Sequence, residues 1–331
     1  MGRFLRTPLC SSLVRWVFPR PTFVITTNPG ALLGNQLTIF AHVIACAREG
    51  GRDIWGASFF MYAQFFEGAS RDVFARFPER RFLIPGARRA RATLYYYVFA
   101  RLVRVLITVP DPPLRDLVLI TDYERRHALE SREFSALLGA RRVAVIEGYF
   151  FRASATSLRR HADVIKRYFR PLKRHEANAA AVVGAARADA DIVVGVHLRK
   201  FGGAHDDNAP SLYRFQHGDD MDRAMRQTAD LFPGKRVTFL LLSNRRVDPH
   251  RYPDFAIAEG TGHVVEDLHA LSLCDYILAS TYSSFSRWAS FYGDVPLYQV
   301  DDPARPFSLE EFRVQIPGFF DPSDESGSIQ V

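Results

Sequence analysis

The chain has 331 residues, of which 47% are hydrophobic and 24% are charged, and its formal net charge at pH 7 is +7. This length allows two domains with separate hydrophobic cores, and the composition is that of a soluble globular enzyme. The surplus of basic residues favours polyanionic ligands such as nucleotide diphosphates or anionic lipids. The sequence contains no nucleic-acid-binding signature, so we expect no nucleic acid partner.

The N-terminal segment, residues 1–20, mixes apolar residues with arginines and is too short and too interrupted to be a membrane span or a secretory signal. Residues 94–106 have a similar aromatic and basic pattern. Such helices either lie on an anionic membrane or pack on a core with extended arginines. Core packing is favoured for residues 94–106, and neither alternative is favoured for the N-terminal segment.

Three cysteines, Cys10, Cys46 and Cys274, show no metal-binding spacing and no disulfide framework. This favours a reducing compartment. We therefore expect a cytoplasmic protein, and we leave peripheral contact with the inner face of an anionic membrane open.

Three strands and several helices are predicted in the first part of the chain, which we assign to a domain of residues 1–177. A strand at residues 22–26 precedes a glycine-containing loop at residues 29–36 and a helix at residues 37–48, an order that lets backbone approach a phosphate closely. The sequence has neither the dinucleotide fingerprint nor the P-loop spelling. Further apolar runs predict strands at residues 117–121 and 143–147.

Strands and helices alternate in the second part of the chain, which we assign to a domain of residues 178–331, with an alanine-rich helix at residues 175–188 as the hinge. The predicted strands are residues 192–196, 237–242, 276–279 and 297–300, and the predicted helices are residues 221–231, 267–274 and 285–292. This alternation predicts a parallel α/β sheet.

Two short polar segments each follow one of these apolar strands. His197-Leu198-Arg199 follows the strand at residues 192–196, and the hydroxyl-rich residues 281–287 follow the strand at residues 276–279 and lead into a helix. In a parallel sheet, ligands bind beyond the carboxyl ends of the strands. A guanidinium together with a helix N-terminus suits a phosphate or pyrophosphate, so the pair predicts a nucleotide or nucleotide-sugar site. The alternative is that each His, Ser or Thr is an ordinary capping or surface residue.

Five short motifs follow one another along the chain. They are Gly34-Asn35-Gln36-Leu37, Gly148-Tyr149-Phe150-Phe151, Tyr168-Phe169-Arg170-Pro171, His197-Leu198-Arg199-Lys200 and the stretch from Glu266 to Trp288. The first, fourth and last resemble the Gly-Asn-Gln loop, the His-x-Arg-Arg motif and the donor-site motif of the fucosyltransferase superfamily, which includes α-1,2, α-1,6 and protein O-fucosyltransferases. The second and third resemble the linking stretch of its bacterial α-1,2 members. The shared order indicates a divergent member.

The resemblance implies a fold of two Rossmann-like α/β domains that face one another across a cleft, the GT-B type of glycosyltransferase. It implies an inverting, metal-independent enzyme that transfers L-fucose from GDP-fucose to a hydroxyl of a glycan or lipid-linked glycan, with no cofactor besides the donor. The loop after Lys200 departs from the family pattern, as do Ala31-Leu32 and Ser243-Asn244. Two alternatives therefore stay open: a transferase of another GDP-sugar, and a non-catalytic nucleotide- or glycan-binding protein.

The resemblance also implies roles for individual residues. Arg199 would clamp the diphosphate and stabilise the charge on the leaving group, and His197 would lie beside the nucleotide or orient Arg199. Ser283 and Ser284 would hold the second phosphate. Asp267 would accept hydrogen bonds from guanine, and its alternative role is that of an ordinary helix cap.

Other candidates are less closely defined. Gly34 and Asn35 would approach the donor sugar from the first domain. The remaining binding candidates are Ser243, Asn244, Phe285, Ser286 and Arg287. His205 and Asp206, in the loop after Arg199, are catalytic candidates for a general base, and Asp207 and Glu147 stay beside them as alternatives.

No metal site is expected. Asp189-Ala190-Asp191 and Asp220-Met221-Asp222 match the DxD spelling of metal-dependent glycosyltransferases. The first precedes a strand and the second begins a helix, where acidic residues act as caps. The histidines are scattered singly along the sequence.

Overall fold

The computed structural model describes residues 14–26, 32–72, 74–81, 97–98, 116–122, 126–198, 218–243, 248–280 and 283–318. The chain divides into two compact units, Met1–Arg170 and Pro171–Val331, which we call the N-terminal unit and the C-terminal unit. Each contains a five-stranded sheet. In the part of the chain that is described, no helix is long and apolar enough to cross a membrane.

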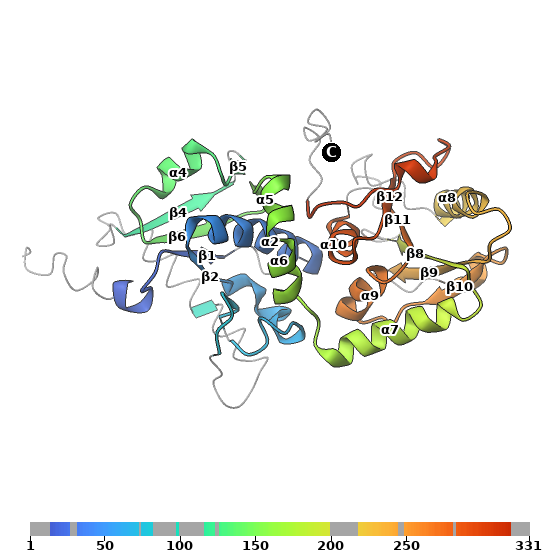
Figure 1. Cartoon of the computed structure of the whole chain (residues 1–331), viewed down its shortest axis with the longest axis horizontal. Helices are drawn as coiled ribbons and strands as arrows, with labels where there is room; N and C mark the ends of the chain where they lie inside the picture. Colours follow the sequence, from blue (N-terminus) through green and yellow to red (C-terminus); the bar gives the residue numbers. More distant parts are fainter. Residues whose placement is uncertain are drawn as a thin grey trace, which may run out of the picture. The chain divides into compact units, whose positions relative to one another are not determined.

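The sheet of the N-terminal unit has the strand order β3-β2-β1-β6-β4 (Figure 1). Its strands are β1 (Thr22–Ile25), β2 (Asp53–Trp55), β3 (Arg76–Phe77), β4 (Leu117–Thr121) and β6 (Val143–Glu147). All pairings are parallel except that of β2 with β3. Two short strands, β5 (His127–Ala128) and β7 (Phe151–Arg152), form a separate pair. The strands predicted at residues 22–26, 117–121 and 143–147 are thus confirmed.

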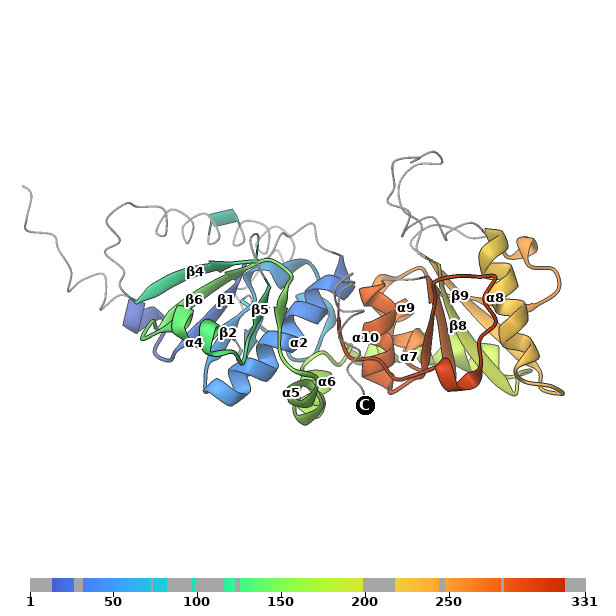
Figure 2. The same ribbon diagram turned by 90° about the horizontal axis from the view of Figure 1, so that it is seen from above.

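The helices of the N-terminal unit are α2 (Leu33–Gly50), α4 (Arg132–Leu138), α5 (Ala155–Arg160) and α6 (Ala162–Tyr168), with 3-10 turns at Ala57–Met61 and Ala63–Phe65. Helix α2 connects β1 to β2 and lies along one face of the sheet, where it contacts α5 and α6 (Figure 2). It ends at Gly51, whose positive φ of 62° lets its N–H bond to the carbonyl of Ala47. The predicted loop at residues 29–36 is wrong in part, because Leu33–Gln36 form the first turn of α2.

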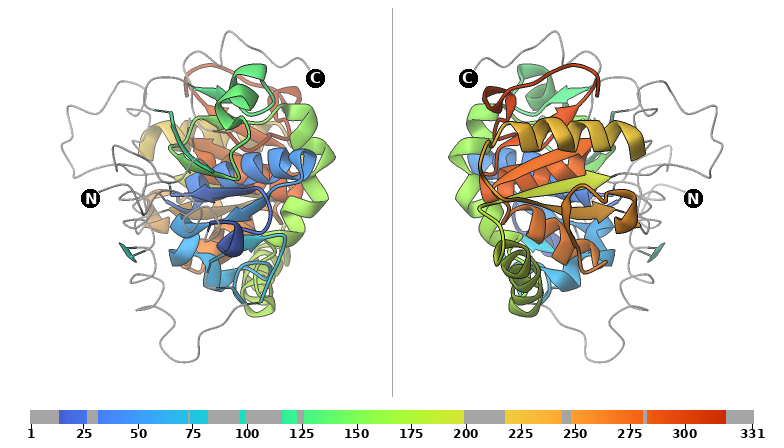
Figure 3. Two further views of the ribbon diagram at one scale, coloured as in Figure 1. Left: turned by 90° about the vertical axis from the view of Figure 1, so that its left-hand side faces the viewer. Right: turned by 90° about the vertical axis from the view of Figure 1, so that its right-hand side faces the viewer.

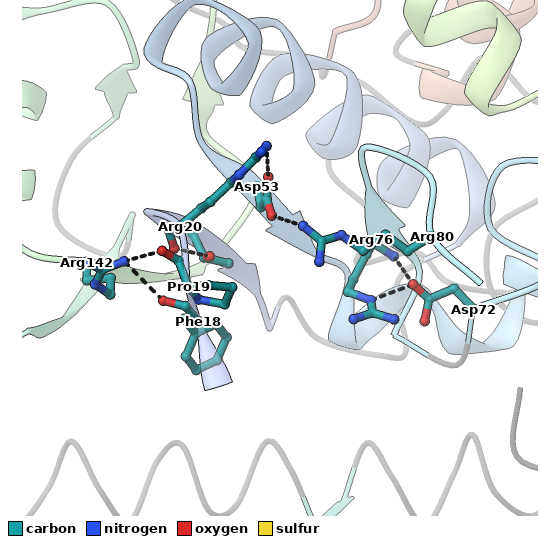
Figure 4. Close-up of polar contacts among 9 residues, drawn as sticks. Phe18, Pro19, Arg20, Asp53, Asp72, Arg76, Arg80 and Arg142 are labelled. Carbon is teal, nitrogen blue, oxygen red and sulfur yellow. Dashed lines mark hydrogen bonds and ion pairs between the residues drawn. The ribbon is translucent and has the colours of Figure 1, made fainter. Parts of the chain in front are cut away.

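Residues 14–20 pack onto the N-terminal sheet. Val14 and Phe18 are buried against Val24, Val143 and Val145, whereas Trp16 is 81% exposed. The carbonyls of Phe18 and Pro19 accept hydrogen bonds from Arg142 at 3.2 and 2.6 Å (Figure 4). Of the two alternatives for the N-terminal segment, its described part therefore favours core packing. The segment at residues 94–106 lies outside the described residues except for 97–98.

Ion pairs fix the edge of the same sheet near β2 and β3. Asp53 begins β2 and pairs with Arg80 at 2.6 Å and with Arg20 at 3.9 Å, and Asp72 pairs with Arg76 at 2.6 Å (Figure 4). The side chains of Asp53 and Asp72 are almost fully buried. Arg20 and Arg80 lie far from Asp53 in sequence, so their pairs with Asp53 tie separate segments to the start of β2.

The sheet of the C-terminal unit has the order β10-β9-β8-β11-β12, and all its pairings are parallel. Its strands are β8 (Ile192–Leu198), β9 (Val237–Ser243), β10 (Ala256–Glu259), β11 (Tyr276–Ser280) and β12 (Leu297–Val300). Its helices are α7 (Lys173–Arg187), α8 (Gly218–Asp230), α9 (Val264–Leu271) and α10 (Ser284–Gly293), with 3-10 turns at Pro249–Arg251 and Leu309–Glu311. Helices α7, α9 and α10 cover one face of the sheet, and α8 lies across the other (Figures 2 and 3).

The parallel α/β sheet predicted for the second part of the chain is therefore confirmed. Sequence reasoning missed β10, and it placed the start of α9 at residue 267 instead of Val264. The expected domain boundary at residue 177 falls inside α7. Because α7 packs on α9 and on β8, β9 and β10, the whole helix belongs to the C-terminal unit, and the division lies between Arg170 and Pro171.

The two sheets share part of their topology. The first strand of each unit, β1 or β8, lies in the middle, the next two strands lie on one side of it, and the last two lie on the other. The last two strands differ in order, because the later strand β6 lies beside β1 in the N-terminal sheet, whereas the earlier strand β11 lies beside β8 in the C-terminal sheet. In each sheet the strand order therefore switches sides at the central strand. In open α/β sheets the crevice beyond the carboxyl ends at such a switch point is where ligands bind.

A pair of glycine substitutions tests the packing of α10 on α9. A Cβ at Gly293 would lie 2.0 Å from the carbonyl oxygen of Ser272, whereas a Cβ at Gly184 in α7 would meet nothing within 4 Å. We expect Gly293→Ala to lower the free energy of unfolding by about 1–3 kcal/mol, because backbone cannot move aside cheaply. Gly184→Ala should raise it by about 0.5–1 kcal/mol. Urea denaturation followed by circular dichroism measures both, and a harmless Gly293→Ala would contradict this packing.

Candidate functional site

His197 lies at the switch point of the C-terminal sheet. It is the penultimate residue of β8 and is paired in register with Ala279 of β11. Side chains alternate along a strand, so Val194, Val196 and Leu198 join the core beneath α8, and His197 points to the opposite face. There its Nδ1 lies 2.7 Å from Ser286 Oγ and 3.1 Å from Ser283 Oγ.

The two serines belong to the start of α10. Ser283 is the N-cap, and its Oγ accepts a hydrogen bond from the N–H of Ser286 at 3.3 Å. The ring of Phe285 stacks on His197 with centroids 4.8 Å apart. His197, Ser283 and Ser286 are all buried. The end of β8 therefore holds the first turn of α10 in place, at the edge where the strands end.

Asp267 lies in the first turn of α9, at the same edge of the sheet. Its Oδ1 accepts hydrogen bonds from the N–H and Oγ of Thr261, at 2.8 and 3.1 Å. Gly260 precedes this loop and is bonded through its N–H to Leu241 of β9, and a Cβ on it would lie 2.7 Å from Asp267 Oδ1. Burial raises the pKa of Asp267, and the bonds from Thr261 oppose this shift. Asp267 thus holds the loop before α9; the N-cap position itself is His263.

The other predicted site residues lie as follows. Ser243 ends β9 and is paired in register with Leu198. Arg287 is half-buried, and its Nε donates to Gln299 Oε1 of β12 at 3.1 Å. Gly34 and Asn35 lie in the first turn of α2, in the N-terminal unit. Arg199, His205, Asp206 and Asn244 lie outside the described residues.

A buried group that sequence reasoning missed lies between α7 and α9. Nδ1 of His175 is 2.7 Å from Glu266 Oε1, and the same oxygen accepts a hydrogen bond from Asn178 at 2.9 Å. The ring of His263 stacks on that of His175, with centroids 4.7 Å apart and planes 14° apart. His175 and Glu266 are 91 residues apart in sequence, so no motif could have signalled the pair.

His175, His263 and Glu266 are a group of described residues whose ligand atoms lie within 4.8 Å of one another. The bonding pattern does not fit a metal ion. Arg174 Nε donates to His175 Nε2 at 3.1 Å, so that nitrogen carries the lone pair and Nδ1–H donates to Glu266. Both ring nitrogens of His175 are thus already used, and a cationic guanidinium lies beside the ring. The group is a hydrogen-bonded cluster.

The residues that match the DxD spelling have structural contacts. Asp191 Oδ2 accepts a hydrogen bond from the backbone N–H of Arg236 at 2.9 Å, and this bond lowers the pKa of the carboxyl. Asp222 pairs with Arg226 at 3.2 Å along α8.

The two described cysteines are not reactive. Burial raises the pKa of both Cys46 and Cys274 to about 12, so neither thiol is a nucleophile at neutral pH.

The cluster at α9 predicts a pH dependence of stability. Burial lowers the pKa of His263 below its usual 6.5, although Glu266 acts in the opposite direction. The unfolded chain therefore binds more protons than the native one between that lowered value and 6.5, and stability rises with pH through this window. Glu266, whose pKa is lowered by His175 and Asn178 against the effect of burial, acts in a separate window below 4.5.

His263→Asn keeps a residue that caps helices well and removes the titrating ring. We expect the parent to gain stability relative to this variant as pH rises from about 5 to about 7. Urea denaturation at a series of pH values measures the difference. A difference that is constant across this range would mean that His263 titrates normally.

The sequence matches no protein-family model and no curated protein. Solved structures do match. An Arabidopsis thaliana FUT1 mutant in complex with GDP has a TM-score of 0.55 at 12% identity, over 91% of this chain and 76% of that one. Selenomethionine fucosyltransferase NodZ from Bradyrhizobium has a TM-score of 0.53 at 17% identity, over 86% and 96%. NodZ α-1,6-fucosyltransferase soaked with GDP-fucose has a TM-score of 0.51 at 18% identity, over 87% and 96%.

At these identities the likeness establishes the fold. It confirms the predicted α/β fold of the GT-B type, and it extends over most of both chains. The cleft expected between the two domains stays a prediction. The chain thus has the fold of the fucosyltransferases that the five sequence motifs resemble.

Proposed function

We propose that this chain is a glycosyltransferase that uses GDP-fucose as donor and a glycan hydroxyl as acceptor. The observation that carries the proposal is the carboxyl edge of the C-terminal sheet. There the ends of β8 and β11 meet, His197 fixes the first turn of α10, and Asp267 lies at the start of α9. The fold at this edge is that of structures solved with GDP or GDP-fucose.

The start of α10 is a suitable place for the diphosphate. The N–H groups of a first helical turn have no partner within the helix and carry the positive end of its dipole. Ser283 and Ser284 lie at this turn. Because the bonds of Ser283 and Ser286 to His197 hold the turn still, a phosphate would bind without an ordering cost. His197 would then act as a positioning residue.

Asp267 is suited to recognise the base. Its Oδ1 accepts from the N–H and the hydroxyl of Thr261, and Oδ2 would accept from guanine N1–H and the exocyclic amine. Adenine and uracil do not offer this pair of donors. A buried acceptor left unpaired costs free energy, so the site would discriminate strongly between bases.

The remaining features of the proposal rest on the resemblance. Arg199 would clamp the diphosphate in place of a metal ion, and His205 or Asp206 would act as the base. Gly34 and Asn35 would contact the sugar, and transfer would be α-1,2-directed and inverting. The acceptor would be a glycan or lipid-linked glycan, and the protein cytoplasmic, with peripheral membrane contact still open.

Nucleotide binding followed by turnover tests the proposal. Purified protein should bind GDP in calorimetric titration and hydrolyse or transfer GDP-fucose when an acceptor mixture is supplied. Turnover of a different GDP-sugar would favour the first alternative, and binding without turnover would favour a non-catalytic role. Absence of GDP binding would exclude all three.

The guanine assignment gives a specific prediction for Asp267. GDP should bind about a hundredfold more tightly than ADP or UDP. Asp267→Asn should remove most of that preference, because an amide oxygen turned toward guanine would place the amide NH2 against the two Thr261 donors. Asp254→Asn is the matched control, since Asp254 is an exposed partner of Arg226 in the same unit. Equal affinities of the parent protein for the three nucleotides would end the guanine assignment.

A further prediction concerns Arg199. Arg199→Ala should abolish turnover and leave the thermal unfolding temperature unchanged, because the lost contacts strengthen in the transition state. Arg199→Lys should also be poor, since an ammonium cannot reproduce the planar fork. Arg223→Ala, at an exposed position of α8, is the control. A near-normal kcat in either Arg199 variant would contradict the clamp. A second test is EDTA treatment of the parent protein: if activity is lost and manganese restores it, a metal ion is required and Arg199 does not replace it.

A further inference from the structure

The His175–Glu266 pair joins α7 to the first turn of α9, and the proposed mechanism does not use it. Both side chains are almost completely buried, at 7% and 8% exposure. Glu266 Oε1 accepts from His175 on one side and from Asn178 on the other. Arg174 donates to the far nitrogen of the His175 ring, which fixes the tautomer that donates to Glu266.

The position of Glu266 determines that of Asp267. The two residues are neighbours in the first turn of one helix, so a bond that fixes the first also fixes the backbone of the second. Asp267 in turn holds Thr261 through two hydrogen bonds. The loop has little room to shift, because a Cβ on Gly260 would meet Leu242 at 2.3 Å and Asp267 at 2.7 Å. A small displacement of α9 would therefore move the Asp267 carboxylate.

We propose that His175, Asn178 and Glu266 form a clamp between α7 and α9 that positions the Asp267 carboxylate and thereby sets the selectivity of the nucleotide site for guanine. This inference rests on the proposed function. The three residues are positioning residues, because their bonds are made to one another and not to the ligand.

The charges around the clamp support this role. Helix α7 presents Arg174 and His175, the loop before α9 presents His263, and α9 itself presents Glu266 and Asp267. The bonds from His175 and Asn178 outweigh the effect of burial and lower the pKa of Glu266. The resulting anion contributes, after burial, to the raised pKa of its neighbour Asp267. The clamp thus affects both the position of the Asp267 carboxylate and the pH at which it ionises.

Two substitutions of His175 separate positioning from packing. His175→Asn places an amide N–H close to where Nδ1–H stands, so it keeps the bond to Glu266. His175→Leu fills similar space without a donor. Glu266→Gln removes the charge, Asn178→Ala removes one of the two bonds at a less buried position, and Glu310→Gln is an exposed control in the same unit.

The readout is the ratio of calorimetric Kd values for ADP and GDP. We expect His175→Leu and Glu266→Gln to reduce this ratio by about tenfold, the equivalent of one lost hydrogen bond. Asn178→Ala should reduce it less, and His175→Asn and Glu310→Gln should retain it. The pH at which GDP affinity reaches half its plateau should fall in Glu266→Gln, because the neighbouring anion is gone. Parent-like ratios in His175→Leu, Glu266→Gln and Asn178→Ala would overturn the clamp.

Hydrogen exchange of the backbone amides of Thr261 and Gly262 tests the clamp without a ligand. This measurement remains decisive if the parent protein shows no preference for GDP and the proposed function fails. The Thr261 N–H donates to Asp267, so its exchange should accelerate in His175→Leu and Asn178→Ala and stay slow in His175→Asn. Unchanged exchange in the folded His175→Leu and Asn178→Ala variants would refute the clamp in that case.

Discussion

The parallel pairing of β8 with β11 is the constraint on which the C-terminal unit depends. Parallel strands must each return to the same starting edge through a helix, so every strand ends, and every following helix begins, at one edge of the sheet. The register of the pair sets His197 opposite Ala279, one residue before the end of β11. Ser283 and Ser286 therefore come within hydrogen-bond distance of His197 without any long loop. The switch point is a consequence of strand order. The fixed position of the first turn of α10 is a consequence of the register between β8 and β11.

Two adjacent carboxyl groups on α9 have different main partners, and Thr261 bonds to both. Glu266 faces α7, where a histidine and an amide donate to it, and Asp267 faces the loop that precedes α9. Like charges on neighbouring residues would repel if both were left without donors. Because Glu266 is bonded to α7 and Asp267 to the loop before α9, both carboxyls are kept in place at the start of one short helix. The fold thus joins α7, α9 and the carboxyl edge of the sheet through side chains instead of backbone.

Much of the fold could be predicted from the sequence, because apolar strands in a parallel sheet are continuous runs. The runs at residues 117–121, 143–147 and 297–300 match β4, β6 and β12. The errors lie where local signals are weak. Gly34-Asn35-Gln36 looks like a loop, yet Gln36 is buried in α2 and accepts from Ser58 at 3.2 Å. Strand β10, with the sequence AIAE, is short and half-exposed, so it lacks an apolar run.

The candidate site was predictable only in part. His197 and Ser283 both follow apolar strands in the sequence, so they could be predicted to lie at one edge of the sheet. Their direct bond depends on the face of β8 from which the His197 side chain projects, and the sequence does not specify that face. The contact of Arg287 with Gln299 depends on the position of β12, and that of His175 with Glu266 joins segments far apart in sequence. Contacts of this kind are set by tertiary packing, which single-sequence patterns do not record.

Net charge does not indicate where the candidate site lies, and the ion pairs show why. Many arginines bind carboxylates of the chain itself, among them the pairs Arg80–Asp53, Arg187–Asp275, Arg226–Asp254 and Arg305–Glu311, at 2.6 to 3.0 Å. Exposed pairs contribute little stability, and they neutralise charge across the surface instead of concentrating it. In the described part of the C-terminal edge, the groups suited to an anion include serine hydroxyls and the N–H groups of α10. Under the proposed function, selectivity there would come from oriented dipoles and the Asp267 carboxylate, so the strand ends are a better guide to the candidate site than the basic composition is.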